Sequence, residues 1–520
     1  MIKFRYILFV VVSLILLGCK KELDQPIYGI QTESNYYKNI DQLSEALNAA
    51  YYSMRRNGQL FNYGEFSTHF LLQDATTDDA NVDGINGWRD WNLLQAFSAR
   101  PENQVLLLNW EARYKSIFQA NLVISRAAGV PGDENLIKRI VNEAKFVRAF
   151  NYYSLATWYG DVPLIVEPQK ATDVFVSRDS RDKVFEQIVA DLTDATSLPL
   201  KSEYPLSDLG RVTSGAAYAM LGKVYLFLNK FEEAENALAK VVLSNEYSLV
   251  PDYGQLFTQE NNNGPESVFE IQYVSDPNGQ QNGGTALVQW FGNRNTGQGF
   301  GFHNPTQDLR NAFDDDDPRI SYTFYQTGDR FAGNSTVEDV GSTTSSTGYL
   351  DRKIYIPPKD QQSVIYDIGY NAHIIRYADV LLLYAEALNE NGKPLEALTR
   401  LEQIRYRARH SDPHDMKKDI QVYIPPTNPA TSLPPVTTTD QGMLREAIWR
   451  ERRVELGMEG WRRDDLLRQK RFGQVMRAYA DTYGTGSFKG GNFDDARDYL
   501  MPIPQEEINR NKSLTQNPGY

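Results

Sequence analysis

Two short segments of the chain combine aromatic rings with side chains that form directional hydrogen bonds. The first segment holds Trp88, Arg89, Trp91 and Asn92, and the second holds Trp290, Phe291, Asn293 and Arg294, followed by Phe300 and Phe302 among glycines. A ring can cover the apolar face of a sugar while amides and guanidinium groups bond its hydroxyl rim, so this pattern is typical of oligosaccharide recognition. Each ring has an alternative role as an anchor of its loop to the core. We expect at least one of Trp88, Trp91 and Trp290 to contact ligand.

An acidic segment overlaps the first of these groups and resembles a calcium loop. Its oxygen-bearing residues alternate before and after Gly84, and they are Asp79, Asn81, Asp83 and Asp90. Hard oxygen ligands at such spacing suit Ca²⁺, but Asp at the last position is a poorer bidentate ligand than Glu, and EF-hand helices do not flank the loop. The favoured interpretation is a solvated acidic turn with no bound cofactor, and the run 314–317 is interpreted in the same way.

Three carboxylates lie four residues apart near the C-terminal end. Glu451, Glu455 and Glu459 fall on one face of a predicted helix, among Arg450, Arg452 and Arg453. A glycosidase needs two carboxylates facing each other across a cleft. Three in one stripe among arginines instead predict an ion-pair network.

Other catalytic signatures do not occur in the sequence. There is no H-E-x-x-H, G-x-S-x-G or Walker A motif, and the chain has five histidines and one cysteine. His410 and His414 straddle a predicted helix end, which argues against a metal site. A net charge of −13 argues against a nucleic-acid partner. We therefore predict no catalytic residues and no enzyme activity.

The N-terminus has the layout of a lipoprotein signal. Lys3 and Arg5 precede an apolar run that ends in Leu-Leu-Gly before Cys19. Residues 1–18 are predicted to be a signal peptide, Cys19 the lipidated residue, and residues 19–35 a tether to the outer membrane. Several acyl chains on one residue give a stable anchor.

The rest of the chain, 36–520, is predicted to be one mainly α-helical domain. Apolar residues recur at helical spacing over 39–56, 110–128, 136–158, 181–196, 213–229, 231–244, 377–391, 394–409 and 444–467. Two helix pairs share identical offsets of small and large residues, and the first pair matches the tetratricopeptide pattern. Those residues are Leu221, Gly222, Tyr225, Ala234, Leu238 and Val241 in one pair, and Tyr384, Ala385, Leu388, Ala397, Leu401 and Ile404 in the other.

The two helix pairs are separated by an insertion with few short strands. We place tetratricopeptide-like units at about 110–245 and 373–470, and a loop-rich ligand face at about 58–109 and 246–372. Residues 266–273 alternate like a strand, whereas 276–348 are rich in Gly, Asn, Ser and Thr. Ligand contacts commonly lie on loops held by a rigid scaffold.

Several motifs, read in order, resemble the SusD/RagB family of Bacteroidetes nutrient-binding lipoproteins. They are Trp110-x2-Arg113-Tyr114, Glu143-Ala144-Lys145-Phe146-Val147-Arg148, Tyr159-Gly160-Asp161-Val162-Pro163, Gly210-Arg211-Val212-Thr213, Arg376-Tyr377-Ala378-Asp379, Glu451-Arg452-Arg453-Val454-Glu455-Leu456 and the terminal Asn517-Pro518-Gly519-Tyr520. Together they span nearly all of the chain that follows the signal peptide.

The resemblance implies a cell-surface protein that captures oligosaccharide and delivers it to a SusC-like TonB-dependent transporter, over whose barrel it sits. Three alternatives stay open. A peptide-binding RagB-like protein would have a deep, less aromatic groove. An exported hydrolase would bring two carboxylates together in a cleft, and a helical-repeat assembly lipoprotein would have no exposed aromatic cluster.

Overall fold

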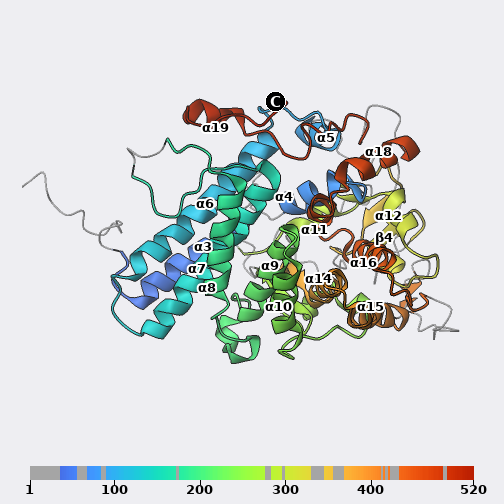
Figure 1. Cartoon of the computed structure of the whole chain (residues 1–520), viewed down its shortest axis with the longest axis horizontal. Coiled ribbons are helices and arrows are strands. Elements are labelled where there is room, and N and C mark those ends of the chain that lie inside the picture. The colour runs from blue at the N-terminus through green and yellow to red at the C-terminus, as the bar shows by residue number, and fades with distance from the viewer. Residues whose placement is uncertain are drawn as a thin grey trace, which may run out of the picture.

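Helices dominate the architecture, as the sequence predicts (Figure 1). The computed structural model describes residues 36–55, 67–82, 89–170, 175–275, 283–294, 299–329, 345–354, 368–411, 414–415, 420–421, 433–483 and 489–520. The predicted signal peptide, Cys19, the tether, Asp83 and Trp88 lie outside these residues.

Four helices near the N-terminus form a bundle, on the left in Figure 1. They are α3 (Ile40–Arg55), α6 (Gln104–Ala127), α7 (Glu134–Tyr159) and α8 (Arg181–Ala195). Helix α7 packs against the other three. The side chain of Ser180 accepts a hydrogen bond from the backbone N–H of Lys183, so the cap signal before α8 correctly marks a helix start.

The two predicted helical hairpins form and lie next to each other. The first consists of α9 (Ser214–Phe227) and α10 (Phe231–Val242), and the second of α14 (Tyr377–Glu390) and α15 (Pro394–Arg409). Helix α10 packs against α14, and α9 packs against α8. One hydrophobic core therefore runs from the bundle through both hairpins. The fold class predicted from the sequence, tetratricopeptide-like hairpins with an insertion, is confirmed.

The stretch 444–467, predicted as one helix, is instead two. Helix α16 (Gln441–Leu456) ends before Gly457, and α17 (Arg462–Arg468) begins after Trp461. Met458 and Gly460 between them have φ of 70° and 78°, a conformation that ends an α-helix. The indole N–H of Trp461 donates to the carbonyl of Ile374, at 2.8 Å, and holds the turn against β6. Helices α18 (Phe472–Tyr483) and α19 (Gln505–Arg510) follow.

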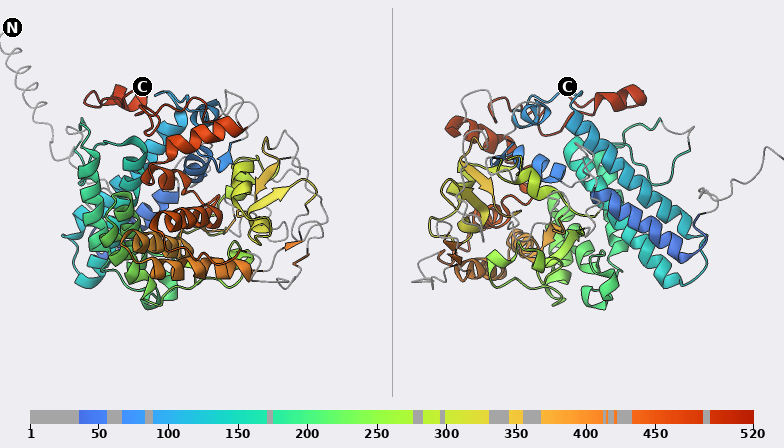
Figure 2. Two further views of the ribbon diagram at one scale, coloured as in Figure 1. Left: turned by 45° about the vertical axis from the view of Figure 1, so that its right-hand side comes forward. Right: turned by 180° about the vertical axis from the view of Figure 1, so that it is seen from behind.

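The insertion is closed at its base by an antiparallel strand pair. Strand β2 (Ser267–Ile271), within the predicted strand 266–273, pairs with β6 (Ala372–Arg376). The other pairs are β1 (Ala80–Asn81) with β3 (Asn304–Pro305), β4 (Phe324–Gln326) with β5 (Tyr349–Asp351), and β7 (His414–Asp415) with β8 (Ile420–Gln421). Figure 2 shows the insertion, in yellow and orange, on the side of the molecule away from the bundle.

Short helices interrupt the stretches predicted to be loops. They are α4 (Ser67–Phe70), the π-helix η1 (Leu71–Ala75), α5 (Arg89–Gln95), α11 (Leu287–Phe291), α12 (Gln307–Ala312) and α13 (Ile320–Thr323); 3₁₀ turns are η2 (Lys201–Glu203), η3 (Leu206–Asp208), η4 (Tyr253–Gln255) and η5 (Gln259–Asn261). In the described part of the chain, no helix is long and apolar enough to cross a membrane.

The close packing of α9 against α10 leads to a first prediction. A Cβ on Gly222 would lie 2.4 Å from Cγ of Leu238. We expect Gly222→Ala to lower the free energy of unfolding by about 1–3 kcal/mol, because Leu238 must move in a packed core. Urea denaturation followed by circular dichroism measures the change.

Gly442, in the first turn of α16, is the matched control. A Cβ there would meet only Asp440, at 3.4 Å. We expect Gly442→Ala to leave the free energy of unfolding unchanged or to raise it by up to about 1 kcal/mol. An unaltered stability in Gly222→Ala would contradict the assigned packing of the hairpin.

Candidate functional site

The two predicted ligand-binding stretches are joined through β1 and β3. Strand β1 belongs to the first stretch and β3 to the second, and they pair in antiparallel fashion. The side-chain amide of Gln95, at the end of α5, bonds both backbone groups of Val82, at 3.0 and 3.1 Å. Helix α5 and the segment that follows α11 are therefore attached to one strand pair.

Trp290, Phe300 and Phe302 form an aromatic stack, of which one ring meets solvent. The rings of Trp290 and Phe302 lie 5.5 Å apart at 30°, and those of Phe300 and Phe302 lie 6.0 Å apart at 24°. Phe300 is 37% exposed, whereas the other two rings are buried. Phe300 is thus an outer ring supported from behind, which is the geometry needed to stack on a sugar.

Backbone hydrogen bonds fix the aromatic stack to α11. The N–H of Phe300 donates to the carbonyl of Gln289 at 2.8 Å, and the N–H of Phe302 to that of Trp290 at 3.0 Å. A Cβ on Gly299 would lie 2.5 Å from the Gln289 carbonyl oxygen, so this close approach requires glycine.

Burial changes the interpretation of four predicted ligand residues. Trp91 is 2% exposed, and Trp290, Phe291 and Asn293 are also buried. The ring of Phe291 packs on that of His303, with centroids 4.7 Å apart. For these residues the structure favours the alternative role, anchoring their segments to the core, because their faces are already covered by protein.

The remaining predicted residues lie nearer to solvent. Arg89 is exposed, and Asn92 and Arg294 are partly buried. The side-chain carbonyl of Asn92 accepts a hydrogen bond from Gln95 at 3.2 Å. Arg89 and Arg294 are therefore predicted cations that are at least partly exposed.

Side-chain oxygens of the segment considered for calcium already take part in ion pairs and hydrogen bonds. Asp79 is buried, not solvated, with its Oδ1 2.7 Å from Nε of Arg453. The side-chain carbonyl of Asn81 accepts from a lysine at 3.1 Å, and Asp90 accepts from the first backbone N–H of α6 at 2.8 Å. Among the described residues, no group of three or more acidic, histidine or cysteine side chains is arranged to hold a metal.

His303 links three parts of the ligand region, and sequence reasoning missed it. Its Nε2 lies 3.0 Å from Oδ2 of Asp74 in η1, and its Nδ1 lies 3.0 Å from Oδ2 of Asp351 in β5. Burial alone would lower the pKa of His303, but the hydrogen bonds to both carboxylates outweigh it and raise the pKa to about 9. A charged imidazolium at neutral pH therefore holds these segments together.

The three glutamates form the predicted ion-pair network, although only Glu451 and Glu455 lie on α16 and Glu459 lies in the turn that follows it. Glu455, in its middle, is fully buried and contacts three guanidinium groups, those of Arg407 at 2.5 Å, Arg319 at 3.0 Å and Arg376 at 3.1 Å. Glu451 binds Arg319 and Arg405, and Glu459 binds Arg376 and Lys353. Each carboxylate is neutralised by cations, so the stripe lacks the free acid and base of a glycosidase.

The partners in this network differ from those expected. Arg452 pairs instead with Asp379 and Asp465, and Arg453 with Asp78, Asp79 and Asp308. Arg450 pairs with Asp314 near the surface. The glutamates and these arginines point to different sides of the helix, so the cations for the stripe come from other elements. Asp317, expected to be solvated, is buried against Arg319 at 2.8 Å.

Two family models match the chain. The model described as "SusD family" matches residues 265–520, and the one described as "Starch-binding associating with outer membrane" matches residues 33–226. SusD-like protein P2 of Formosa agariphila is 29% identical over 99% of each chain. A SusD-like protein of Bacteroides ovatus is 25% identical over 99% of this chain and 98% of its own.

Solved structures share the fold. A laminarin binding SusD-like protein superposes with a TM-score of 0.75 and 25% identity, over 93% of this chain and 100% of that chain. Surface glycan-binding protein A from Bacteroides thetaiotaomicron, in complex with laminarihexaose, has a TM-score of 0.72 and 21% identity, over 92% of this chain and 99% of that chain.

The network on α16 yields a second prediction. Replacing Glu455 by Gln leaves three arginines without their shared carboxylate, so we expect the free energy of unfolding to fall by about 3–5 kcal/mol. Glu446→Gln is the control, because Glu446 is 61% exposed and pairs with Arg471 at the surface. There we expect a change below about 1 kcal/mol. Equal effects in the two variants would contradict a network that stabilises the fold.

The same two variants should differ in how their free energy of unfolding depends on pH. Burial would raise the pKa of Glu455, but Arg407, Arg376 and Arg319 outweigh it and lower the pKa to about 2. A lowered pKa means that the carboxylate stabilises the fold above its unfolded pKa, near 4.5, and loses this effect as pH falls toward 2. Between pH 5 and 3, stability should therefore fall less steeply in Glu455→Gln than in the wild type or in Glu446→Gln.

Proposed function

The chain belongs to the SusD family, and on this premise we propose that it is an oligosaccharide receptor of the outer membrane and not an enzyme. The observation that supports this most directly is the aromatic stack, in which the partly exposed ring of Phe300 packs on the buried ring of Phe302. The names of the related structures, which mention laminarin and laminarihexaose, make β-glucans the first ligands to examine.

The proposed recognition mode combines stacking with hydrogen bonding. Phe300 covers the apolar face of a sugar ring, and Arg294 and Arg89 bond hydroxyl groups at its rim. Trp88, adjacent to Arg89, is proposed as a second platform from the first stretch. The buried Trp290 and Phe302 serve as support for Phe300, because a ring fixed in place loses little conformational freedom on binding.

A non-catalytic role is supported by the state of the carboxylates. Glu451, Glu455 and Glu459 are buried and neutralised by cations. A glycosidase would need one carboxylic acid and one carboxylate facing a bound sugar. We propose instead that bound glycan is passed, unaltered, to a SusC-like TonB-dependent transporter.

The first experiment is isothermal titration calorimetry of residues 20–520 with a panel of plant, host and microbial oligosaccharides, beginning with laminarihexaose. We expect one glycan class to bind without product formation, and Phe300→Ala to weaken binding by about tenfold or more, through loss of the stacking ring. Phe118→Ala is the control, because Phe118 is 45% exposed but lies on α6. The proposal would be contradicted if no oligosaccharide of the panel bound, or if Phe300→Ala and Phe118→Ala weakened binding equally.

Membrane attachment is proposed to depend on Cys19, which lies outside the described residues. We expect the wild-type protein to incorporate labelled fatty acid in cells and Cys19→Ala to incorporate none, since the thiol is the point of acylation. After cell fractionation, we expect the wild type in the membrane pellet and Cys19→Ala outside it. Fatty-acid labelling that persists in Cys19→Ala would show that the anchor lies elsewhere.

A further inference from the structure

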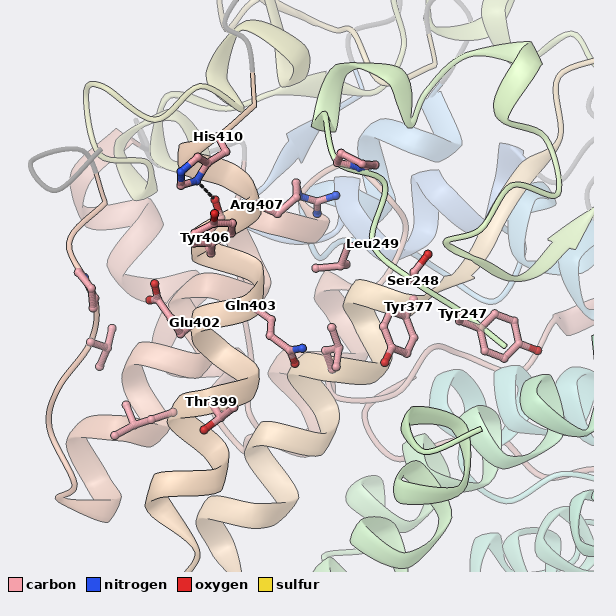
Figure 3. A pocket seen from close by; sticks show the side chains of 15 residues that line it. Tyr247, Ser248, Leu249, Tyr377, Thr399, Glu402, Gln403, Tyr406, Arg407 and His410 are labelled. Atoms are coloured by element: carbon pink, nitrogen blue, oxygen red, sulfur yellow. Dashed lines mark hydrogen bonds between the residues drawn. The ribbon is translucent and has the colours of Figure 1, made fainter. Parts of the chain in front are cut away.

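A cleft of about 1010 Å³ lies on the second hairpin, and its lining residues are not those of the aromatic stack. Helices α14 and α15 form one wall, and the segments 247–251 and 435–436 complete it. Figure 3 shows the side chains that project toward this space. The sequence did not single out this surface.

Aromatic rings stand at both ends of the cleft. At one end Tyr406 is 57% exposed, and the ring of His410 stacks on it with centroids 4.0 Å apart at 25°. At the other end the rings of Tyr247 and Tyr377 lie nearly parallel, 6.3 Å apart at 25°, but both residues are buried, so Tyr406 offers the accessible ring. Figure 3 shows these two groups on opposite sides of Gln403.

Neutral hydrogen-bonding groups lie between the two ends. The side chains of Ser248, Thr399 and Gln403 line the cleft and belong to exposed residues. Hydroxyl and amide groups both donate and accept hydrogen bonds, so they match the hydroxyl groups of a sugar. The cleft thus repeats, with different residues, the combination of rings and neutral polar groups that suits a glycan.

The charged groups of the cleft are already paired. Glu402 pairs with Arg409, and Arg407 pairs with Glu266 and Glu455. A charged ligand would compete with these ion pairs, whereas an uncharged one leaves them intact.

The extended wall of the cleft disfavours a peptide. Peptides commonly bind by adding a strand to an exposed backbone edge. Here Pro434 and Pro435 have no N–H, and the carbonyls of Leu433 and Pro434 accept from Arg409 and Arg405 at 2.6 and 2.9 Å. These backbone groups of residues 433–435 are therefore not available to pair with a second strand.

We propose that this cleft is a second oligosaccharide-binding site, with Tyr406 as its main stacking platform. It shares its ligand class with the proposed function, but its residues lie on α14, α15 and the two segments beside them. A chain with two such sites holds two short glycans at once, or one long glycan at two points, and in the second case the first contact raises the effective concentration of the glycan at the other site.

Calorimetry with four variants of residues 20–520 tests the second site. The variants are Phe300→Ala, Tyr406→Ala, the double variant, and Tyr483→Ala as a control, because Tyr483 is an exposed tyrosine on α18. The probes are laminarihexaose and maltoheptaose. We expect the wild type to bind two equivalents of one probe, each single variant to bind one, the double variant to bind none, and Tyr483→Ala to match the wild type.

The outcomes separate this inference from the proposed function. One equivalent that is lost in Phe300→Ala and kept in Tyr406→Ala would overturn the second site alone. If binding is lost in Tyr406→Ala and unchanged in Phe300→Ala, the site in the cleft is supported and the role of Phe300 is overturned. No binding by the wild type would overturn both, and binding of an unstructured peptide, abolished by Tyr406→Ala, would overturn the choice of glycan as occupant.

Discussion

The arrangement of the whole molecule depends on the burial of carboxylates along one side of α16. Removing an ion from water costs several kcal/mol unless partners surround it. Glu455 meets this requirement only because Arg319 comes from the insertion, Arg376 from the end of β6 and Arg407 from α15. Elements distant in sequence are thus held in one relative position, since displacing any of them leaves a buried charge unpaired.

This charge network also supports the surfaces proposed to bind ligand. Successive residues of a helix point about 100° apart. On α15, Arg407 therefore faces the network while its neighbour Tyr406 faces the cleft. In the loop-rich region the charged His303 has a similar role, because it fixes η1 and β5 beside the aromatic stack. Both candidate surfaces thus adjoin residues held by buried charges, and such support reduces the entropy lost on binding.

Features set by local sequence were predictable. The hairpins, the cap at Ser180 and the glutamate stripe follow from helical periodicity and charge spacing. The break between α16 and α17 could not be predicted from local sequence, because it depends on a hydrogen bond from Trp461 to Ile374 of β6. The burial of Trp91 and Trp290 could not be predicted either, because it depends on how segments distant in sequence pack together. The residue pattern marked these rings as candidates for ligand contact, but only the fold shows which aromatic rings are buried and which are exposed.

The pairing of β2 with β6 has a consequence for how such proteins diversify. Because the two ends of the insertion meet in one antiparallel pair, they stay together when the chain between them changes in length. Closing a loop twice as long costs only about 0.6 kcal/mol more. Changes between β2 and β6 can therefore accumulate without unfolding the helices, as long as they keep Arg319 against Glu451 and Glu455. Divergence of the insertion can thus change the surface that this segment presents while the helical scaffold keeps its structure.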